Sequence, residues 1–346
     1  MSFDVTILGA GAFGLSCAWA LVRRGAKVRV IDPNGVGAGA SGGIVGALAP
    51  HVPEQWNAKK AFQLDSLLMA ETWWADVAQA GGGDPGYART GRLQPIPDGS
   101  ARTLAEARAQ QATTLWQGRA TWQIRNATPG WSPGTPEVIH DTLSARLHPR
   151  RACEALAAAI RCKGGEIVVE GPLDGVILHA TGWQGLAQMR DGQGRPAGAG
   201  IKGQAILLDL DRRVAPQLYV DGLHVIPHAD GTTAIGSTSE REFEHEDPDA
   251  QCDDLLGRAI VALPILADMP VLARWAGIRP RARSRAPLLG KWPGRSVHYI
   301  ANGGFKIGFG MAPKVAEVMA DLILEGRDAI PDAFRTDGLA SWDGKG

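Results

Sequence analysis

The chain has 346 residues, and its 36 lysine and arginine residues are balanced by 36 aspartate and glutamate residues. This length predicts about two domains. A content of 45% apolar and 21% charged residues is typical of a globular protein, and it excludes whole-chain disorder, collagen and coiled coil. Because the formal net charge is zero, we expect no basic surface for nucleic acid or for an anionic membrane.

The cysteines and the N-terminal segment indicate the compartment. The four cysteines have no CxxC spacing, so we expect neither a metal site nor a redox pair. The first apolar strand begins at Asp4, which leaves no room for a signal peptide before it. Segment 35–50 is uncharged, but it consists mostly of Gly, Ala and Ser and is poorly suited to cross a membrane. We therefore expect a cytoplasmic protein.

The predicted elements start with a βαβ unit, formed by strand 4–8, helix 12–24 and strand 27–31. Further helices are expected at 60–80, 101–117 and 150–163, and further strands at 166–169 and 176–180. Between residues 203 and 238, short alternating apolar runs separated by Asp, Gly and Pro predict antiparallel strands. The last predicted elements are a helix at 253–267, strands at 271–278 and 297–302, and a helix at 312–325.

A GxGxxG motif lies between the first strand and the first helix, formed by Gly9, Gly11 and Gly14. In this context the glycines permit a tight turn, the close approach of a pyrophosphate, and the packing of helix on strand. The helix N-terminus favours an anion. Asp32, at the end of the second strand, can accept hydrogen bonds from ribose hydroxyls. The sequence therefore predicts a dinucleotide-binding site.

The motif alone does not separate NAD from FAD. Three further segments of small residues follow predicted strands or precede predicted helices, at 39–43, 180–182 and 303–310. Small residues let the backbone approach a cofactor closely. No second GxGxxG is present for a separate nicotinamide nucleotide. These observations favour FAD.

The order of further motifs resembles that of the D-amino-acid oxidase, glycine oxidase and sarcosine oxidase superfamily of flavoenzymes. The resemblance runs from residue 4 to about residue 326. It rests on GAGAFG (9–14), Asp32, GASGG (39–43), TGRL (90–93), HPRR (148–151), HATGW (179–183), KGQ (202–204), IPHADG (226–231), IGST (235–238), AGIRPR (276–281), PLLG (287–290) and GGFKIGFGMAP (303–313).

The predicted fold class is α/β: a Rossmann-like FAD-binding domain with an inserted mixed or antiparallel β-sheet substrate domain. The FAD-binding domain is expected to be discontinuous, with segments 1–75, 138–199 and 276–330. The substrate domain comprises 76–137 and 200–275, and residues 331–346 form a C-terminal tail.

The resemblance implies an FAD-dependent oxidase or dehydrogenase that acts on an amino acid or a secondary amino acid, a small-molecule substrate. A hydride would pass from Cα or an N-methyl carbon to flavin N5, and the resulting imine would be hydrolysed. No side-chain base is required if the amine binds uncharged, so no catalytic residue is assigned. The cysteine that attaches flavin in sarcosine oxidases would fall near Gly277, so noncovalent FAD is expected.

The predicted FAD-binding residues combine the GxGxxG motif with positions carried over from the resemblance. They are Gly9, Gly11, Ala12, Phe13, Gly14, Asp32, Pro33, Ala40, Ser41, Gly42, Gly43, His51, Thr181, Gly182, Gly304, Gly308, Phe309 and Met311. The glycine loop before the last helix can direct backbone N–H groups at the negative charge of a reduced flavin. For His51, a purely structural role is the alternative.

Two cations are expected to hold the substrate carboxylate. Arg279 matches the family's arginine, whose planar guanidinium fits a carboxylate bidentately. Lys306 matches a position where related enzymes place a lysine or arginine. The alternatives are a salt bridge between domains for Arg279 and a solvated loop lysine for Lys306.

This sequence departs from the family at two positions of the substrate pocket. At His224, glycine-oxidase-like members tend to have tyrosine, and at His228 they tend to have arginine. His224 is predicted to bind substrate, either by donating a hydrogen bond or by recognising a second anionic group.

Three other functions stay open. Three arginines within residues 281–285 would favour an FAD enzyme that acts on a tRNA base side chain or a natural-product amine, or simply form a solvated basic loop. A non-catalytic flavin-binding protein and an NAD-dependent dehydrogenase are the other two.

Overall fold

The structure is a computed structural model, and it describes residues 2–340. Six strands form one sheet in the order β15-β16-β9-β1-β2-β8. Five run parallel, and β15 pairs antiparallel with β16. Their bounds are β1 Val5–Leu8, β2 Val28–Ile31, β8 Glu166–Val168, β9 Val176–His179, β15 Leu288–Lys291 and β16 His298–Asn302.

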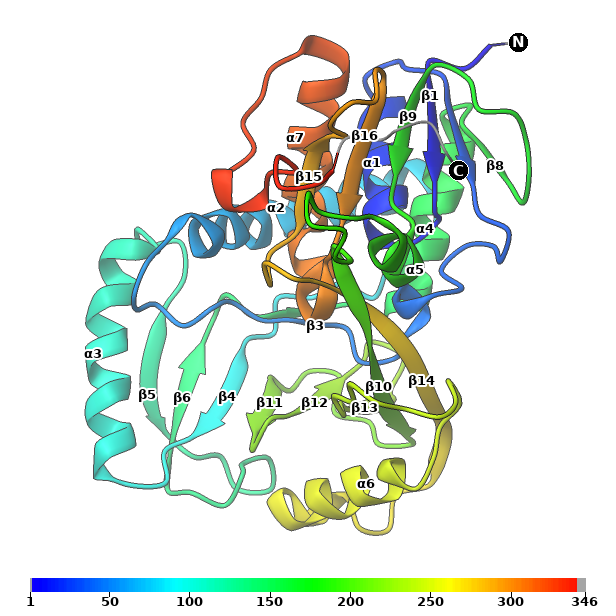
Figure 1. The fold of residues 1–346 in the computed structure, drawn as a ribbon. Coiled ribbons are helices and arrows are strands. Elements are labelled where there is room, and N and C mark those ends of the chain that lie inside the picture. Colours follow the sequence, from blue (N-terminus) through cyan, green and yellow to red (C-terminus); the bar gives the residue numbers. More distant parts are fainter. Residues whose placement is uncertain (1, 341–346) are drawn as a thin grey trace.

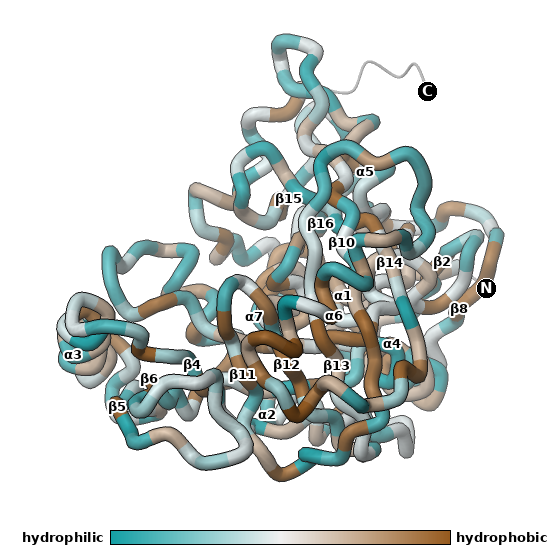
Figure 2. Tube along the Cα trace, turned by 90° about the horizontal axis from the view of Figure 1, so that it is seen from below, coloured by the Kyte–Doolittle hydropathy of each residue, from teal (hydrophilic) through white to brown (hydrophobic). Residues whose placement is uncertain are grey.

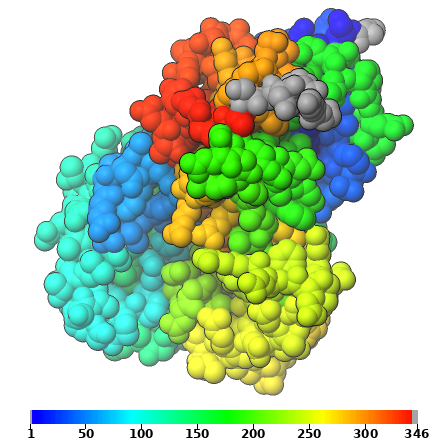
Figure 3. Space-filling view, viewed as in Figure 1, coloured from blue at the N-terminus to red at the C-terminus, as the bar shows by residue number. Residues whose placement is uncertain are grey.

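Four helices pack on one another and share one hydrophobic core with this sheet: α1 (Ala12–Val22), α2 (Ala58–Gly81), α4 (Pro149–Cys162) and α7 (Gly308–Glu325). The α2 helix is capped at both ends, because the Asn57 side chain accepts a hydrogen bond from Lys60 N and Gly82 adopts a left-handed conformation (φ 69°). Segments from the start, middle and end of the chain thus gather in one half of the molecule (Figure 3).

A second sheet has eight strands in the order β14-β10-β13-β12-β11-β4-β6-β5. Neighbours are antiparallel except β11 and β4, which run parallel. Their bounds are β4 Arg92–Pro95, β5 Trp122–Asn126, β6 Glu137–Asp141, β10 Gly198–Leu208, β11 Gln217–Val220, β12 Leu223–Pro227, β13 Thr233–Gly236 and β14 Val271–Ala282. A short pair, β3 (Ala47–Leu48) and β7 (Ala145–Arg146), accompanies the two sheets.

The eight-stranded sheet lies below the parallel sheet in Figure 1, with α3 (Gly99–Leu115) beside β5 and α6 (Gln251–Ala262) below. Its outer face carries apolar residues that pack against α6, among them Leu218, Val225 and Ile235. Figure 2 shows these hydrophobic stretches along β11, β12 and β13. The short α5 (Gly182–Gln188) packs on β10 and β14.

The strand register places the predicted substrate residues on the opposite, inner face. Tyr219 pairs with His224, and His224 pairs with Gly236. Gly203 pairs with Gly277, two residues from Arg279 on β14. Because successive side chains alternate between the faces of a sheet, His224 and Arg279 project from the same face.

The predicted fold class is confirmed by these two sheets and their helices. Three expected domain boundaries fall inside strands of the eight-stranded sheet, at residue 138 within β6, residue 200 within β10 and residue 276 within β14, and the boundary after residue 75 falls inside α2. The tail expected at 331–346 lies partly outside the described residues, and its Phe334 is buried against Phe62, with ring centroids 5.1 Å apart.

The last helix begins earlier than expected, at Gly308 rather than Ala312. The segment from Gly308 to Met311, predicted as a loop, is therefore the first turn of α7. Glycine and the internal Pro313 disfavour a helix in isolation. Burial of this turn in the core overrides that local preference.

A buried lysine on the outer face ties the chain before α6 to the sheet. Lys202 Nζ lies 2.6 Å from Asp249 Oδ2 and 3.8 Å from Glu240 Oε2, and its residue exposure is 0%. Gln204 donates from Nε2 to Asp249 Oδ1 at 2.7 Å. Removing the cation would leave two carboxylates without their partner.

We therefore predict that Lys202→Met lowers the melting temperature by about 5–10 °C, since breaking an ion pair with a buried partner is costly. Thermal unfolding followed by circular dichroism measures the change. Lys163→Met, at the exposed C-terminal cap of α4, serves as the control. Equal melting temperatures for the two variants would contradict the prediction.

Candidate functional site

The GxGxxG turn brings three backbone segments into contact. A Cβ at Gly14 would lie 1.9 Å from Gly9 O, and a Cβ at Gly9 would lie 2.3 Å from Ala180 O. Gly9 also has φ +110°, which disfavours any residue with a side chain. Gly11 is the N-cap of α1, and as a glycine it has no side chain that could form a capping hydrogen bond. The turn therefore presents the helix N-terminus to a ligand, as a pyrophosphate requires.

Asp32 is held beside this turn. Its Oδ2 accepts a hydrogen bond from Ala10 N at 2.8 Å, and its Oδ1 accepts one from Asn34 N at 3.0 Å. The neighbouring Pro33 is exposed. Each carboxylate oxygen keeps a further lone pair that can accept a hydrogen bond from a ribose hydroxyl.

The second small-residue segment lies directly against the first. Ser41 Oγ accepts a hydrogen bond from Ala12 N at 2.9 Å, and Gly37 N donates to Ala10 O at 2.9 Å. Residues Ala40–Gly42 form a single 3₁₀ turn, and Arg150 Nε donates to Gly42 O at 2.8 Å. The hydroxyl of Ser41 and the guanidinium of Arg150 thus lie near the GxGxxG turn.

Asn302 connects the remaining predicted FAD segments to one another, and one of these segments packs on α1. Its Nδ2 donates to Gly182 O at 2.9 Å, and its Oδ1 accepts from Gly303 N at 2.7 Å. A Cβ at Gly304 would lie 3.0 Å from Phe13 Cζ, so the 303–304 loop packs on the first turn of α1. Glycines at which a Cβ would collide with neighbouring atoms therefore lie along the path from Gly9 to Gly304. This close approach of backbone segments fits a bound dinucleotide.

The last three residues of the predicted FAD set, Gly308, Phe309 and Met311, differ in their surroundings. No atom lies within 4 Å of a Cβ built at Gly308. Phe309 packs on Trp74, with ring centroids 6.3 Å apart. Met311 is completely buried in the first turn of α7, so its contact with FAD stays a prediction.

His51 is fixed by Gln63 of α2. Gln63 Oε1 accepts a hydrogen bond from His51 N at 2.8 Å and also contacts His51 Nδ1, while Gln63 Nε2 donates to Ala49 O at 3.1 Å. Burial lowers the pKa of His51, which keeps the ring neutral. His51 therefore has a structural partner, and its contact with FAD stays a prediction.

Arg279 is a buried cation without a carboxylate. Its residue is 8% exposed, and Nη1 donates to the backbone oxygen of Thr238 at 3.1 Å. A Cβ at Gly203 would lie 1.9 Å from both terminal nitrogens, so the guanidinium lies flat over that glycine. No carboxylate within residues 2–340 comes within 4 Å of it, which excludes a salt bridge there. Burial lowers the pKa of Arg279 to about 10, so it remains charged at neutral pH.

Lys306 stands next to Arg279. It lies in the 3₁₀ turn Phe305–Ile307 before α7, and its side chain reaches solvent. Its pKa lies below the ordinary lysine value because the protein desolvates the ammonium and because Arg279 is positively charged nearby. Two cations with no carboxylate within 4 Å among the described residues favour an anionic ligand, although the charge of Glu240 also acts on Arg279.

His224 lies between Lys306 and a cation that sequence analysis missed. Burial, together with the charges of Arg92 and Lys306, lowers the pKa of His224 to about 3. Its Nδ1 is buried and has no hydrogen-bond partner among the described residues, and its ring lies 4.7 Å from that of Tyr219. At neutral pH the ring is uncharged and can donate or accept one hydrogen bond.

Arg92 was part of the TGRL motif, but no role was predicted for it. Its Nε donates to Asp141 Oδ2 at 2.9 Å, and its Cζ lies 5.7 Å from the centre of the Tyr219 ring. The parallel pairing of β4 with β11 brings it there. Nothing in the local sequence pattern signals this pairing.

His228 lies further along β12 and has structural partners. Its Nε2 is 2.8 Å from Ile44 O, and its ring lies 5.0 Å from that of His148. Burial lowers its pKa to about 4. The ring therefore links the hairpin β12–β13 to the segment before β3.

The arginine-rich segment 281–285 is engaged with the protein. Arg281 lies over the Phe305 ring at 5.7 Å, and Arg283 Nη1 is 2.7 Å from Asp191 Oδ2. These contacts leave the segment partly neutralised and do not favour a polyanionic partner.

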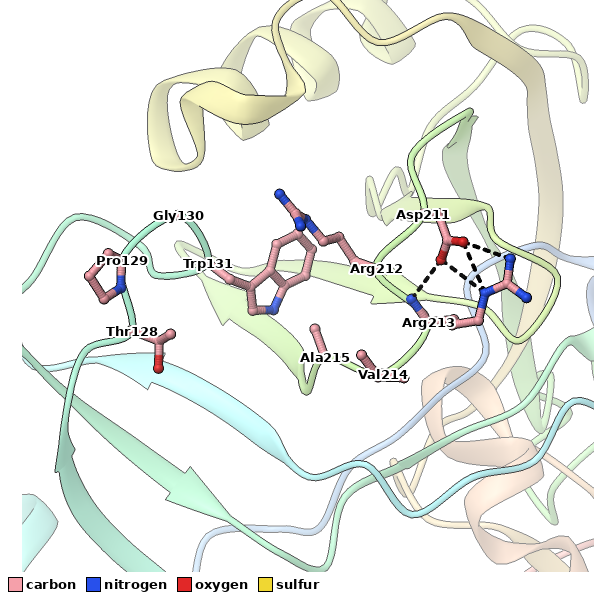
Figure 4. A pocket seen from close by; sticks show the side chains of 9 residues that line it. All are labelled: Thr128, Pro129, Gly130, Trp131, Asp211, Arg212, Arg213, Val214 and Ala215. Atoms are coloured by element: carbon pink, nitrogen blue, oxygen red, sulfur yellow. Dashed lines mark hydrogen bonds and ion pairs between the residues drawn. The ribbon is translucent and has the colours of Figure 1, made fainter.

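Two hollows of about 450 Å³ and 290 Å³ lie elsewhere on the β-rich half. Both are lined by Trp131, whose Nε1 donates to Pro216 O at 2.8 Å. Figure 4 shows the first, where Asp211 forms an ion pair with Arg213. Leu93, Val138 and His140 line the second and belong to the outer face of the sheet. The hollows are therefore distinct from the site on the inner face.

Burial lowers the pKa of seven histidines below 6.5: His51, His140, His148, His179, His224, His228 and His298. In the unfolded chain these rings take up protons below about pH 6.5, whereas in the folded protein they do so only at lower pH. Unfolding therefore binds protons in this window, and the free energy of unfolding falls as the pH falls.

We predict that the urea midpoint decreases between pH 7.5 and pH 5.0. His179→Gln, which removes a ring with a pKa of about 4 outside the candidate site, should make this decrease shallower. Urea titrations of both proteins at the two pH values test the prediction. A midpoint that is constant with pH in the original protein would contradict it.

No helix within residues 2–340 is long and apolar enough to cross a membrane. Residues 4–322 match the model of a family described as FAD dependent oxidoreductase. Glycine oxidase from Pseudomonas putida is 29% identical over 368 residues, which cover 96% of this chain and 97% of that protein.

Two solved structures share the fold. Iminodiacetate oxidase from Chelativorans sp. superposes with a TM-score of 0.83 at 21% identity, over 96% of this chain and 98% of that chain. Glycine oxidase from Bacillus cereus gives a TM-score of 0.82 at 19% identity, over 99% and 100%. The chain therefore belongs to the family of FAD-dependent oxidoreductases that contains glycine oxidase, and it is an FAD-dependent enzyme.

Proposed function

We propose that this enzyme oxidises an amine that carries a carboxylate, either an amino acid or a secondary amino acid. The observation that carries the proposal is the buried guanidinium of Arg279, which has Lys306 beside it and no carboxylate partner. The names of the relatives agree with this substrate class, since glycine is an amino acid and iminodiacetate is a secondary amine with two carboxylates.

When bound, FAD supplies the two-electron acceptor. The proposed FAD contacts are the predicted residues from Gly9 to Met311 described above, with Asp32 at a ribose and the N-terminus of α1 at the pyrophosphate. We propose that the FAD is noncovalent, because position 277 is a glycine covered by the Trp275 ring, 2.3 Å from where a Cβ would lie.

Arg279 would bind the substrate carboxylate through two parallel hydrogen bonds. Gly203 keeps the guanidinium close to the sheet, because any side chain there would displace it. Lys306 would contact the same carboxylate from the loop before α7.

The same charges would keep the substrate amine uncharged. Positive charges near an ammonium group lower its pKa and favour the neutral amine, whose lone pair assists the departure of a hydride from the adjacent carbon. His224 is neutral at physiological pH and adds no competing charge. No side-chain base is required in this arrangement.

A screen of amines under anaerobic conditions tests the proposed function. We expect amino acids or N-substituted amino acids to bleach the flavin absorbance, and amines of equal size without a carboxylate to leave it unchanged. A flavin that no carboxylate-bearing amine reduces would indicate a non-catalytic flavin protein instead.

The clamp can be tested on the best substrate of that screen. We predict that Arg279→Met lowers kcat/KM by about 100-fold, since charge-assisted hydrogen bonds to the carboxylate are lost. Arg274→Met is a matched control, because Arg274 lies on the same strand and pairs with Asp253 at the surface. Stopped-flow reduction of the flavin measures both variants, and equal rates would exclude the proposed role of Arg279.

A second variant tests the FAD site. We predict that Gly14→Ala yields protein that retains less than about a tenth of its FAD, because the new methyl group would overlap Gly9 O and force α1 away from the turn. Gly99→Ala, where no atom lies within 4 Å of the added Cβ, is the control. The ratio of absorbance at 450 nm to that at 280 nm after purification gives the retained fraction. A full complement of FAD in Gly14→Ala would contradict the prediction.

A further inference from the structure

One more cation projects from the inner face of the eight-stranded sheet. Arg92 is only 5% exposed, and its sole hydrogen bond to another side chain within the described residues runs from Nε to Asp141. A guanidinium has five N–H donors, and leaving them unpaired in a protein interior is costly. Its terminal nitrogens therefore remain available to a ligand.

The orientation of Arg92 is fixed by its surroundings. Asp141 is completely buried, and its second oxygen accepts a hydrogen bond from Ser144 N at 2.8 Å. Gly91, which precedes Arg92, adopts φ +78°, and a Cβ there would lie 2.7 Å from His140 Nε2, so no residue with a side chain fits. Asp141 thus holds Arg92 by its Nε, and Arg92 Cζ lies over the Tyr219 ring, 5.7 Å from its centre.

Arg92 and the carboxylate clamp border the same space. The charge of Arg92 acts on His224, the charge of Lys306 acts on His224, and the charge of Arg279 acts on Lys306. Geometry agrees with this order: the Tyr219 ring lies 4.7 Å from the His224 ring and 5.7 Å from Arg92 Cζ, and His224 projects from the same sheet face as Arg279. Arg92 is paired with Asp141, and the charge of Glu240 acts on Arg279, so the three cations exceed these two carboxylates by one charge.

A substrate with one carboxylate would engage only Arg279 and Lys306. A substrate with two acid groups could also bind the terminal nitrogens of Arg92, and leaving these donors unpaired in a desolvated site is unfavourable. The unpartnered edge of Arg92 and the unpartnered Nδ1 of His224 provide hydrogen-bond partners for the second acid group.

We propose that Arg92, together with His224, binds a second acid group, so that the enzyme prefers amines that carry two acid groups. This inference rests on the proposed function, because it places the first acid group at Arg279 and Lys306. Arg92 is here a specificity-determining residue that contacts substrate through its terminal nitrogens.

Binding of unreactive ligands tests the inference without turnover. Unbranched dicarboxylates from succinate to pimelate are compared with monocarboxylates of equal chain length, butyrate to heptanoate, on the FAD-loaded enzyme. Perturbation of the flavin absorbance gives the Kd of each ligand. We expect at least one diacid to bind about tenfold more tightly than its monoacid partner, the size of a charge-assisted hydrogen bond.

Variants assign the preference to Arg92. Arg92→Met should bring the ratio of the two Kd values close to one. Arg92→Lys keeps a cation for Asp141 but lacks the second edge of the fork, so it should fold and yet lose most of the preference. Arg195→Met is the matched control: it removes a surface arginine whose Nε also lies 2.9 Å from a carboxylate, that of Asp191, and it should keep the original ratio.

Three outcomes would overturn the inference. They are equal Kd values for every diacid and monoacid pair in the original enzyme, an unchanged ratio in Arg92→Lys, and a ratio lost equally in the Arg195→Met control. Failure of the proposed function is distinguishable: no amine with either one or two carboxylates would then reduce the flavin, whereas the proposed function stands if any of them does and no diacid preference is found.

Discussion

A guanidinium buried without a carboxylate is the constraint on which the candidate site depends. Arg279 lies flat on Gly203 because the glycine has no side chain, and its one hydrogen bond in the described structure goes to Thr238 O. Desolvating a charge without a counter-ion opposes folding. The charge of Glu240 acts on Arg279 without a direct contact, and an anionic ligand of the kind proposed would give the guanidinium a contacting counter-ion.

The half of the molecule that contains the predicted FAD segments contacts the inner face of the eight-stranded sheet at glycines. The Trp275 ring lies against Gly43, where a Cβ would be 3.2 Å away, and a Cβ at Gly236 would lie 2.4 Å from the Val45 side chain. At each of these two contacts, one half contributes a glycine and the other half contributes a side chain. This close approach sets the thickness of the space between the FAD segments and the inner face of the sheet.

Local patterns predicted the parts of the site that lie close together in the chain. The GxGxxG motif and Asp32 were assigned from strand and helix periodicity alone, because the βαβ unit is complete within 32 residues. Resemblance supplied Arg279 and Lys306. Neither route gave Arg92, since its place depends on β4 pairing with β11, strands more than 120 residues apart in the chain. The Gln63 partner of His51 was missed because it lies on the buried side of α2.

The strands β5 and β6 were also missed. In β5, Trp122 and Ile124 alternate with the exposed Gln123 and Arg125, but two apolar residues are too few to mark a strand in the sequence. The start of α7 was placed too late, since two glycines precede Pro313 and read as a loop. In both cases burial against a neighbouring element, rather than local preference, decides the structure.

The charges of the site also explain how binding and chemistry are linked. In the proposed function, the same cations that would attract the acid group of a substrate would also lower the pKa of its amine, so binding would favour the neutral amine that oxidation requires. A carboxylate placed beside the amine would favour the protonated form and oppose the reaction. The carboxylate of Asp141 is offset by Arg92, whose Nε donates to one oxygen at 2.9 Å, while Ser144 N donates to the other at 2.8 Å. The charge of this buried acid is therefore balanced by Arg92, and Arg279 and Lys306 remain positive.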